Sequence, residues 1–222
     1  MKVDFNLSQL DYRARTEFLS SSDIKTLLEN PYKYKNNISR GESDRLTLGS
    51  AVHALILEPQ NFERDFLVMP ELNLRKNEDK AIKEELEKTA LINKKTLIKS
   101  EVYTQAVEIS ESFKNNKIYK LFQEKGHAEA SFFSEIDGIK CKCRPDFILT
   151  DKKIILDLKT TSTEGGASAD VFLKTIANFK YYIQAAFYLE LTKAEEFYFI
   201  VIETNSPFMV GLYKLDRQSL EF

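Results

Sequence analysis

The sequence predicts a mixed α/β fold in which a central mixed β-sheet of about five strands is flanked by helices. Apolar residues recur at helical spacing in residues 1–125, whereas residues 126–222 carry alternating segments joined by turn signals. The composition, 43% hydrophobic and 30% charged, is that of an ordinary globular protein, and 222 residues suit one domain. We therefore expect a single domain over residues 1–222, made of a mainly helical N-terminal part (1–125) and a sheet-containing core (126–222).

Helical periodicity predicts four helices in the first part, over residues 20–30, 47–58, 76–90 and 100–115. Ser20 and Asp23 have the spacing of a capping box, which marks a helix start. Pro31 and Pro59 fall where the first two helices should stop, because proline cannot continue a helix. The last two helices are rich in Lys and Glu, so we expect their charged faces to be solvated.

Alternation predicts five strands in the second part, over residues 127–136, 139–149, 154–160, 196–203 and 208–215. Asp137-Gly138 is a strong signal for a two-residue hairpin turn between the first two strands, and Thr150 to Lys152 forms the next turn. Residues 170–191 are expected to be helical, with a break near Asn178 as an option.

These turns fix which side chains face each other across the strands. The Asp137-Gly138 turn places Glu129 opposite Asp146, and a turn over Thr150 to Lys153 places Asp146 opposite Asp157. Three carboxylates should therefore form a row on one face, with facing Cβ atoms about 5 Å apart. Lys159 joins that face because it lies two residues beyond Asp157. Pro145 disfavours a regular central strand, so we expect a bulge there.

A row of carboxylates destabilises a sheet unless it binds something positive. Mg²⁺ prefers carboxylate oxygens, waters and phosphates, so the row predicts a divalent-metal site. The alternative is three exposed acids on a solvated face. Every second residue of the strand leading to this row is basic, namely Lys140, Lys142 and Arg144. We predict that they contact DNA phosphates. The alternative is that they form only the solvated face of the sheet. The net charge of −2 does not decide between these interpretations.

Several motifs resemble one nuclease family. Arg144-Pro145-Asp146 is followed after ten residues by Asp157-Leu158-Lys159, which resembles the PD-(D/E)xK signature. Other motifs of RecB-like members occur in the expected order: Leu19 to Ser22, Asn30 to Tyr34, Leu48 to His53, His127 to Glu129, and Tyr181 to Tyr188. Over residues 18–200 the sequence is most similar to the C-terminal nuclease domain of exonuclease VIII (RecE) and related phage proteins. The resemblance implies a restriction-endonuclease-like core.

The resemblance also implies roles for individual residues. The metal ligands would be His53, Glu129, Asp146, Asp157 and the backbone carbonyl of Leu158. Lys159 would act on the attacking water and on phosphate charge, and Gln184 and Tyr188 would position the substrate or the lysine. Because Lys159 lies near several carboxylates, we expect it to stay protonated and to act electrostatically.

The implied activity is that of a Mg²⁺-dependent deoxyribonuclease, with Mn²⁺ as a substitute. It would degrade linear double-stranded DNA from 5′ to 3′ in recombination, as a homo-oligomer and with a single-strand annealing protein as partner. Arg45 is a candidate for DNA contact, and Arg40 and Arg45 are candidates, by charge alone, for the residue that senses a 5′ phosphate. The alternatives are an endonuclease on the same fold, a non-catalytic DNA-binding or assembly protein on a decayed nuclease fold, and a hydrolase of small phosphoesters.

The number of cysteines limits which metal cofactors the chain can hold. Cys141 and Cys143 are too few for a four-ligand zinc or iron–sulfur site, so we expect reduced thiols and no iron–sulfur cluster. No apolar run approaches the roughly 20 residues needed to span a bilayer, and no secretory signal is apparent. We therefore expect a cytoplasmic protein, without membrane partners, of a bacterium or a phage-infected cell.

Overall fold

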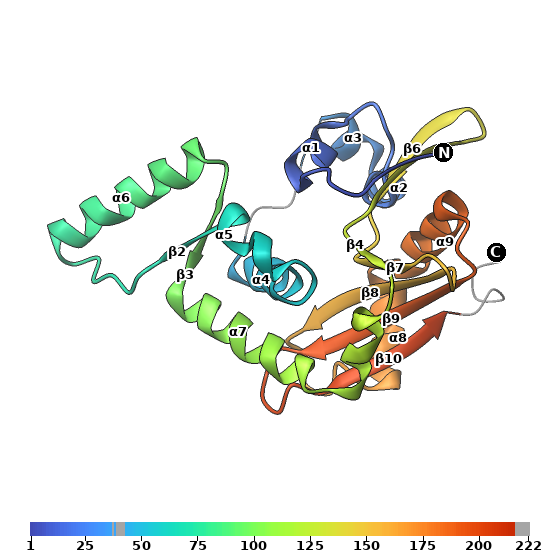
Figure 1. Cartoon of the computed structure of the whole chain (residues 1–222). Coiled ribbons are helices and arrows are strands. Elements are labelled where there is room, and N and C mark those ends of the chain that lie inside the picture. Colours follow the sequence, from blue (N-terminus) through green and yellow to red (C-terminus); the bar gives the residue numbers. More distant parts are fainter. Residues whose placement is uncertain (37, 39–42, 216–222) are drawn as a thin grey trace. The chain divides into compact units, whose positions relative to one another are not determined.

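The computed structural model describes residues 1–36, 38 and 43–215 (Figure 1). The chain forms two compact units, one made of Met1–Arg40 with Ile118–Phe222 and the other of Gly41–Lys117. The first unit is discontinuous in sequence, and it contains both the N-terminal segment and the sheet-bearing second half of the chain. Each unit is described below by itself.

The first unit is built on a five-stranded sheet in the order β10-β9-β8-β7-β4. Its strands are β4 (His127–Ala128), β7 (Phe147–Leu149), β8 (Ile154–Thr161), β9 (Glu196–Glu203) and β10 (Val210–Leu215). β8 and β9 are parallel, and the other neighbours are antiparallel. The predicted mixed sheet of five strands is therefore confirmed, and β8, β9 and β10 form its broad part in Figure 1.

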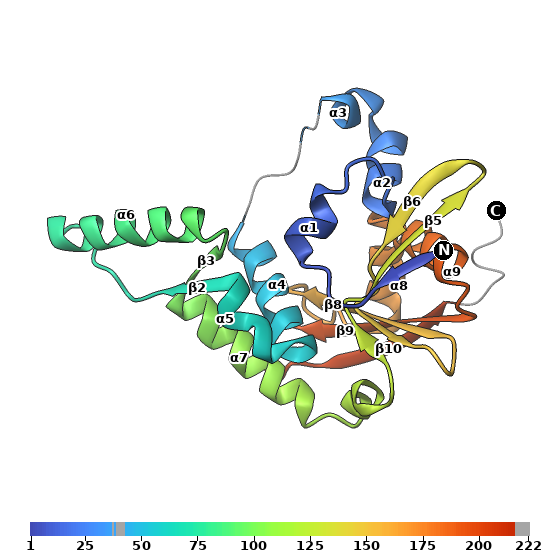
Figure 2. The ribbon, with the colours of Figure 1, turned by 45° about the horizontal axis from the view of Figure 1, so that its top comes forward.

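The same unit contains a second, three-stranded sheet that was not predicted. It consists of β1 (Lys2–Asp4), β5 (Ser131–Ile136) and β6 (Ile139–Cys143) in the order β1-β5-β6, and is visible in Figure 2. The strands expected over 127–136 and 139–149 are each interrupted, because Glu129 has a positive φ of 51° and Pro145 cannot donate to the ladder. One long hairpin therefore serves both sheets.

The hairpin turn has the predicted form. Asp137 and Gly138 both have positive φ angles, 50° and 78°, which suit a two-residue turn that follows the strand twist. Phe132 pairs with Cys143 in the three-stranded sheet. Ala128 pairs with Phe147 in the five-stranded sheet, so the same register continues across the interruption.

Helices pack against these strands. They are α1 (Gln9–Ala14), α2 (Ser21–Glu29), α3 (Pro31–Lys35), α8 (Ala169–Asn178) and α9 (Tyr181–Thr192), with a 3₁₀ segment η2 (Lys117–Gln123) where the sequence passes from the second unit back to the first. The capping box at Ser20 is confirmed: its hydroxyl accepts from the Asp23 N–H, and the Asp23 carboxylate accepts from the Ser20 N–H. The break near Asn178 is also confirmed, because Lys180 adopts a left-handed conformation between α8 and α9.

The core of the first unit lies between the sheet and these helices. Phe172, Phe197 and Phe199 are almost fully buried and pack against one another and against the apolar faces of α8 and α9. Burying aromatic side chains of this size supplies the main driving force for docking the helices on the sheet. This packing fixes α9, which carries Gln184 and Tyr188, over the strand that carries Asp157.

The second unit is mainly helical. Its elements are α4 (Asp44–Leu57), η1 (Pro59–Asn61), α5 (Phe62–Asp65), β2 (Phe66–Met69), α6 (Asn77–Ile92), β3 (Thr96–Lys99) and α7 (Ser100–Lys114). The helices predicted over 47–58, 76–90 and 100–115 are confirmed. The short parallel pair β2–β3, joined through α6, was not predicted. Buried Val52, Ile98 and Phe113 belong to the apolar core of this unit.

Candidate active site

Three carboxylates meet where the ladders of β4, β7 and β8 end. The Glu129 N–H donates to the Asp146 carbonyl at 3.0 Å, which extends the β4–β7 pairing to these two residues. The β7–β8 register, extended by one residue, places Asp146 opposite Asp157. The nearest ligand oxygens of Glu129 and Asp146 lie within 4.8 Å of each other. The structure thus brings together the row of acids that the turns predicted.

The Asp146 carboxylate is anchored on the next strand. Its Oδ2 accepts a hydrogen bond of 2.6 Å from the Leu158 N–H. Leu158 is itself fully buried, so its backbone is held rigidly in β8. The bond holds the Asp146 side chain against β8, the strand that carries Asp157.

Asp157 and Lys159 project from the same face of β8. Asp157 is only 1% exposed, and the Lys159 ammonium donates to its Oδ2 in a close ion pair. Gln184 of α9 donates from Nε2 to Oδ1 at 2.6 Å. Two polar side chains therefore orient the buried carboxylate, as is typical of a preorganised site.

The Lys159 ammonium also lies over the ring of Tyr181, at 4.9 Å from its centre. Attraction between a cation and an aromatic face restrains the lysine from a second direction. Tyr181 belongs to the predicted motif Tyr181 to Tyr188, but its role beside the lysine was not predicted. The signal that could have found it is the spacing of three residues ahead of Gln184.

Burial and neighbouring charges shift the pKa values of Asp146 and Lys159. Burial, and next the charge of Asp157, raise the pKa of Asp146 to about 8, although Lys159 and the Leu158 N–H oppose the shift. Burial acts against the charge on Lys159, but Asp157 and Asp146 outweigh it and raise the lysine pKa. Lys159 therefore stays protonated, as expected. The donors are all hard oxygens, and a divalent cation would displace the proton that the raised pKa keeps on Asp146, so the site suits a hard divalent cation.

Tyr188 completes this side of the site. Burial raises its pKa well above the ordinary value, and the neighbouring acids Asp157 and Asp146 act in the same direction. The phenol is therefore neutral, and it can act as a hydrogen-bond donor but not as a base.

Two further metal ligands were predicted, His53 and the backbone carbonyl of Leu158. His53 lies in α4 of the second unit, and its part in a metal site stays a prediction. The same holds for the Leu158 carbonyl. Arg45 is exposed in the first turn of α4, and Arg40 lies outside the described residues.

The three basic residues that were predicted to contact DNA, Lys140, Lys142 and Arg144, have different surroundings from one another. Lys140 is exposed, opposite Glu135. Lys142 is buried, and its ammonium donates to the carbonyls of Tyr12 and Arg15. Arg144 is also buried and donates to Glu129 at 2.6 Å. The physical reason is that the N-terminal segment covers this face of the hairpin, so the two inner cations bind protein oxygens where phosphates were expected.

The thiols of Cys141 and Cys143 are buried and not joined in a disulfide. Burial raises the pKa of the Cys143 thiol well above the ordinary value, so it is a poor nucleophile and metal ligand. In the part of the chain that the structure describes, no helix is both long and apolar enough to cross a bilayer.

The similarity to one solved structure with a TM-score above 0.5 agrees with this fold. A candidate exonuclease from Eubacterium rectale is similar over 98% of this chain and 80% of its own, with a TM-score of 0.64 and 16% identity. A phage-related exonuclease from Haemophilus somnus 129PT is similar over 76% of this chain and 82% of its own, with a TM-score of 0.37 and 15% identity. Among curated proteins, none matches the chain. Residues 20–222 match the family described as a PDDEXK-like domain of unknown function, DUF3799, and the chain therefore belongs to that PDDEXK-like family.

Proposed function

We propose that this protein is a divalent-metal-dependent nuclease that hydrolyses phosphodiester bonds of DNA, with Mg²⁺ as its natural ion. The observation that carries the proposal is the carboxylate row Glu129, Asp146 and Asp157, with the Lys159 ammonium beside it. Structural proteins have little reason to bury acids together, since the arrangement costs free energy unless a cation compensates it. Membership of a PDDEXK-like family supports the same chemistry.

The residues that would hold the metal are those of the row. Asp146 and Asp157 would be its main ligands, joined by the Leu158 carbonyl, and Glu129 and His53 would complete the set. When bound, a divalent cation acidifies water and offsets negative charge on the scissile phosphate.

The other side chains would orient the reacting groups. Lys159 would stabilise negative charge on the phosphate, because its raised pKa keeps it protonated and unsuited to remove a proton. Gln184 would hold Asp157 in place through its bond to Oδ1. Tyr188 would donate a hydrogen bond from its neutral phenol to the substrate or to its neighbours.

We propose linear duplex DNA as the substrate and exonucleolytic 5′-to-3′ degradation as the reaction, in a recombination pathway. The similarity to a candidate exonuclease with a TM-score of 0.64 supports exonucleolytic action. The RecE resemblance supports direction, assembly into a homo-oligomer and cooperation with a single-strand annealing protein. Lys140 and Arg45 are exposed cations that could contact the DNA backbone.

The test uses linear duplexes labelled at the 5′ or the 3′ end, beside a closed circle. Each DNA is incubated with the wild type or with Asp157→Ala, in Mg²⁺ or in EDTA. The proposal predicts Mg²⁺-dependent early release of the 5′ label, with the circle spared and the variant inactive. Cutting of the circle would move the function to an endonuclease. No cleavage in Mg²⁺ or Mn²⁺ by folded protein would refute the catalytic proposal.

A further inference from the structure

The Arg144 guanidinium joins three parts of the first unit. Its Nε donates to Oε2 of Glu129 at 2.6 Å, and its Nη1 donates to the Leu7 carbonyl at 2.8 Å and to the Ser131 hydroxyl at 3.1 Å. The side chain is only 7% exposed. Because a planar guanidinium donates in fixed directions, these bonds define the position of the acid relative to the N-terminal segment.

The backbone at Glu129 departs from a regular strand. Its φ of 51° lies in the left-handed region, at the point where the hairpin passes from β4 to β5. The regular alternation of a strand therefore does not direct its side chain toward Asp146. The side chain is 20% exposed, so packing alone does not fix it either. The bond from Arg144 restrains the position of its carboxylate.

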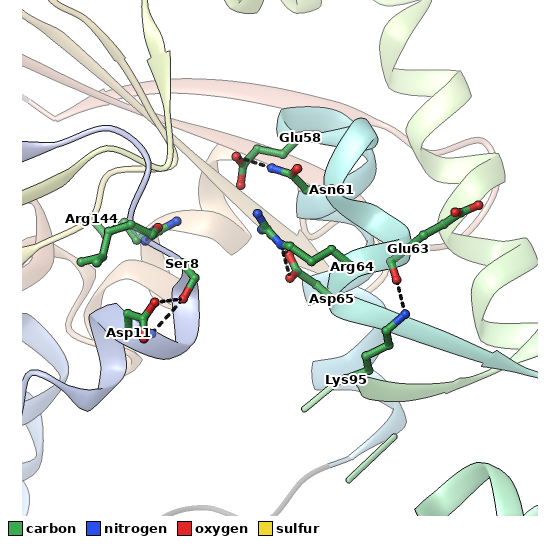
Figure 3. Close-up of polar contacts among 10 residues, drawn as sticks. Ser8, Asp11, Glu58, Asn61, Glu63, Arg64, Asp65, Lys95 and Arg144 are labelled. Atoms are coloured by element: carbon green, nitrogen blue, oxygen red, sulfur yellow. Dashed lines mark hydrogen bonds and ion pairs between the residues drawn. The ribbon is translucent and has the colours of Figure 1, made fainter. Parts of the chain in front are cut away.

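Arg144 is in turn held by the segment that precedes α2. β1 pairs with β5, and Leu19 exchanges backbone hydrogen bonds of 2.8 Å with the β6 residues Lys140 and Lys142. The Tyr12 ring lies beneath both buried cations, 4.8 Å from the Lys142 ammonium and 5.7 Å from the Arg144 guanidinium. Figure 3 shows Arg144 next to Ser8 and Asp11, which cap α1 through the Ser8 hydroxyl.

We propose that Arg144 is a positioning residue for the metal ligand Glu129, and that the segment Lys2–Leu19 holds Arg144 in place. This segment lies ahead of residue 20, where the match to the family begins. The inference rests on the proposed function, since it assumes that Glu129 binds the metal. It assigns a role at the active site to a part of the chain that precedes the family match, and it gives Arg144 a function other than DNA contact.

The first test compares Arg144→Lys with a matched control, Lys142→Met. Lysine keeps the charge but cannot reach Glu129, Leu7 and Ser131 together. Calorimetric titration with Mn²⁺ should show affinity weaker by about 10- to 100-fold for Arg144→Lys, the usual effect of losing a partner of a metal ligand. Lys142→Met removes a neighbouring buried cation that binds the same segment but does not touch Glu129. Its melting temperature should fall, while its Mn²⁺ affinity should fall by much less than that of Arg144→Lys, because Arg144 and its bond to Glu129 remain.

A double-mutant cycle then asks whether Arg144 acts through Glu129. In a Glu129→Gln background, Arg144→Lys should change Mn²⁺ affinity by much less than in the wild type. Ser131→Ala, which removes one acceptor of Arg144, serves as a milder second variant if Arg144→Lys does not fold. Its loss of affinity should be smaller but should likewise shrink in the Glu129→Gln background.

DNA binding in EDTA separates positioning from phosphate contact. A residue that contacts phosphate lowers the salt dependence of binding when its charge is removed, whereas the proposal predicts no change for Arg144→Gln. Folded Arg144→Lys with wild-type Mn²⁺ affinity, or an effect that persists in full in the Glu129→Gln background, would overturn the positioning role alone. A wild type that binds no Mn²⁺ would overturn the proposed metal site and the positioning role together.

Discussion

Replacing Asp146 by asparagine should stabilise the metal-free protein while removing its activity. Burial and the charge of Asp157 raise the pKa of Asp146 to about 8. Near neutral pH the folded, metal-free protein therefore holds a proton on Asp146 that the unfolded chain has lost. Folding takes up this proton, so the contribution of Asp146 to stability falls as pH rises from about 4 to about 8. Asparagine is neutral at every pH and carries no such cost.

The size of the effect follows from the shift. An ordinary Asp pKa of about 3.9 lies about three pH units below neutrality, and each unit corresponds to about 1.4 kcal/mol, which sets an upper value of about 4 kcal/mol at pH 7. Asp146 is only half-buried by its surface exposure, and it shares Lys159 with Asp157, so solvent and redistribution of charge reduce the cost. We expect Asp146→Asn to raise the free energy of unfolding by about 1–4 kcal/mol at pH 7 in EDTA. Asparagine keeps an oxygen that can accept from the Leu158 N–H.

Urea unfolding in EDTA, followed by circular dichroism and tyrosine fluorescence, measures the difference; the chain has ten Tyr and no Trp. The gain should grow between about pH 5 and 8. The control is Asp151→Asn, which removes an exposed acid paired with Lys125 and should change stability by less than about 1 kcal/mol. A destabilised Asp146→Asn protein, or a difference that does not depend on pH, would refute the reasoning.

Three further outcomes are expected. Because a metal must displace the proton of Asp146, the apparent Mn²⁺ affinity should rise with pH up to about 8 and level off above it. Calorimetric titration in buffers of different ionisation enthalpy measures the number of protons released on binding. Gln184→Leu removes the donor to Asp157 and should lower the cleavage rate by about 10-fold or more, measured beside an unchanged circular dichroism spectrum. Gly166→Ala places a Cβ about 2.6 Å from a Thr161 methyl carbon and should lower the free energy of unfolding, measured in urea, by about 1–3 kcal/mol. An unchanged free energy would mean that the loop around Gly166 shifts to make room for the Cβ.

The sequence predicted most of the sheet and the geometry of the carboxylate row, because both depend on local signals. Asp137-Gly138 allows one tight turn, and this turn alone fixes which residues pair across the hairpin. Once Glu129 faces Asp146, the next turn places Asp157 in the same row. Register therefore follows from a few residues, and the position of the candidate site follows from register.

What could not be predicted depends on contacts between distant segments. Alternation shows that Lys142 and Arg144 share a face, but it does not show what covers that face. The N-terminal segment covers that face. The composition of this segment does not predict that β1 pairs with β5. The short strands β2 and β3 were missed for the same reason, since they pair across the whole of α6. The left-handed conformation of Glu129, which splits the hairpin between two sheets, is likewise set by its tertiary surroundings.

The central claim is that the row of Glu129, Asp146 and Asp157 holds a divalent cation that serves DNA cleavage. Its most direct test is the rate of cleavage of a linear duplex, measured against Mg²⁺ concentration for the wild type, Asp157→Asn and the surface control Asp151→Asn. We predict a rate that saturates with Mg²⁺ in the wild type and the control, and a loss of at least about 100-fold in Asp157→Asn. Equal rates in Asp157→Asn and the wild type, or no cleavage by the folded wild type with Mg²⁺ or Mn²⁺, would contradict the claim.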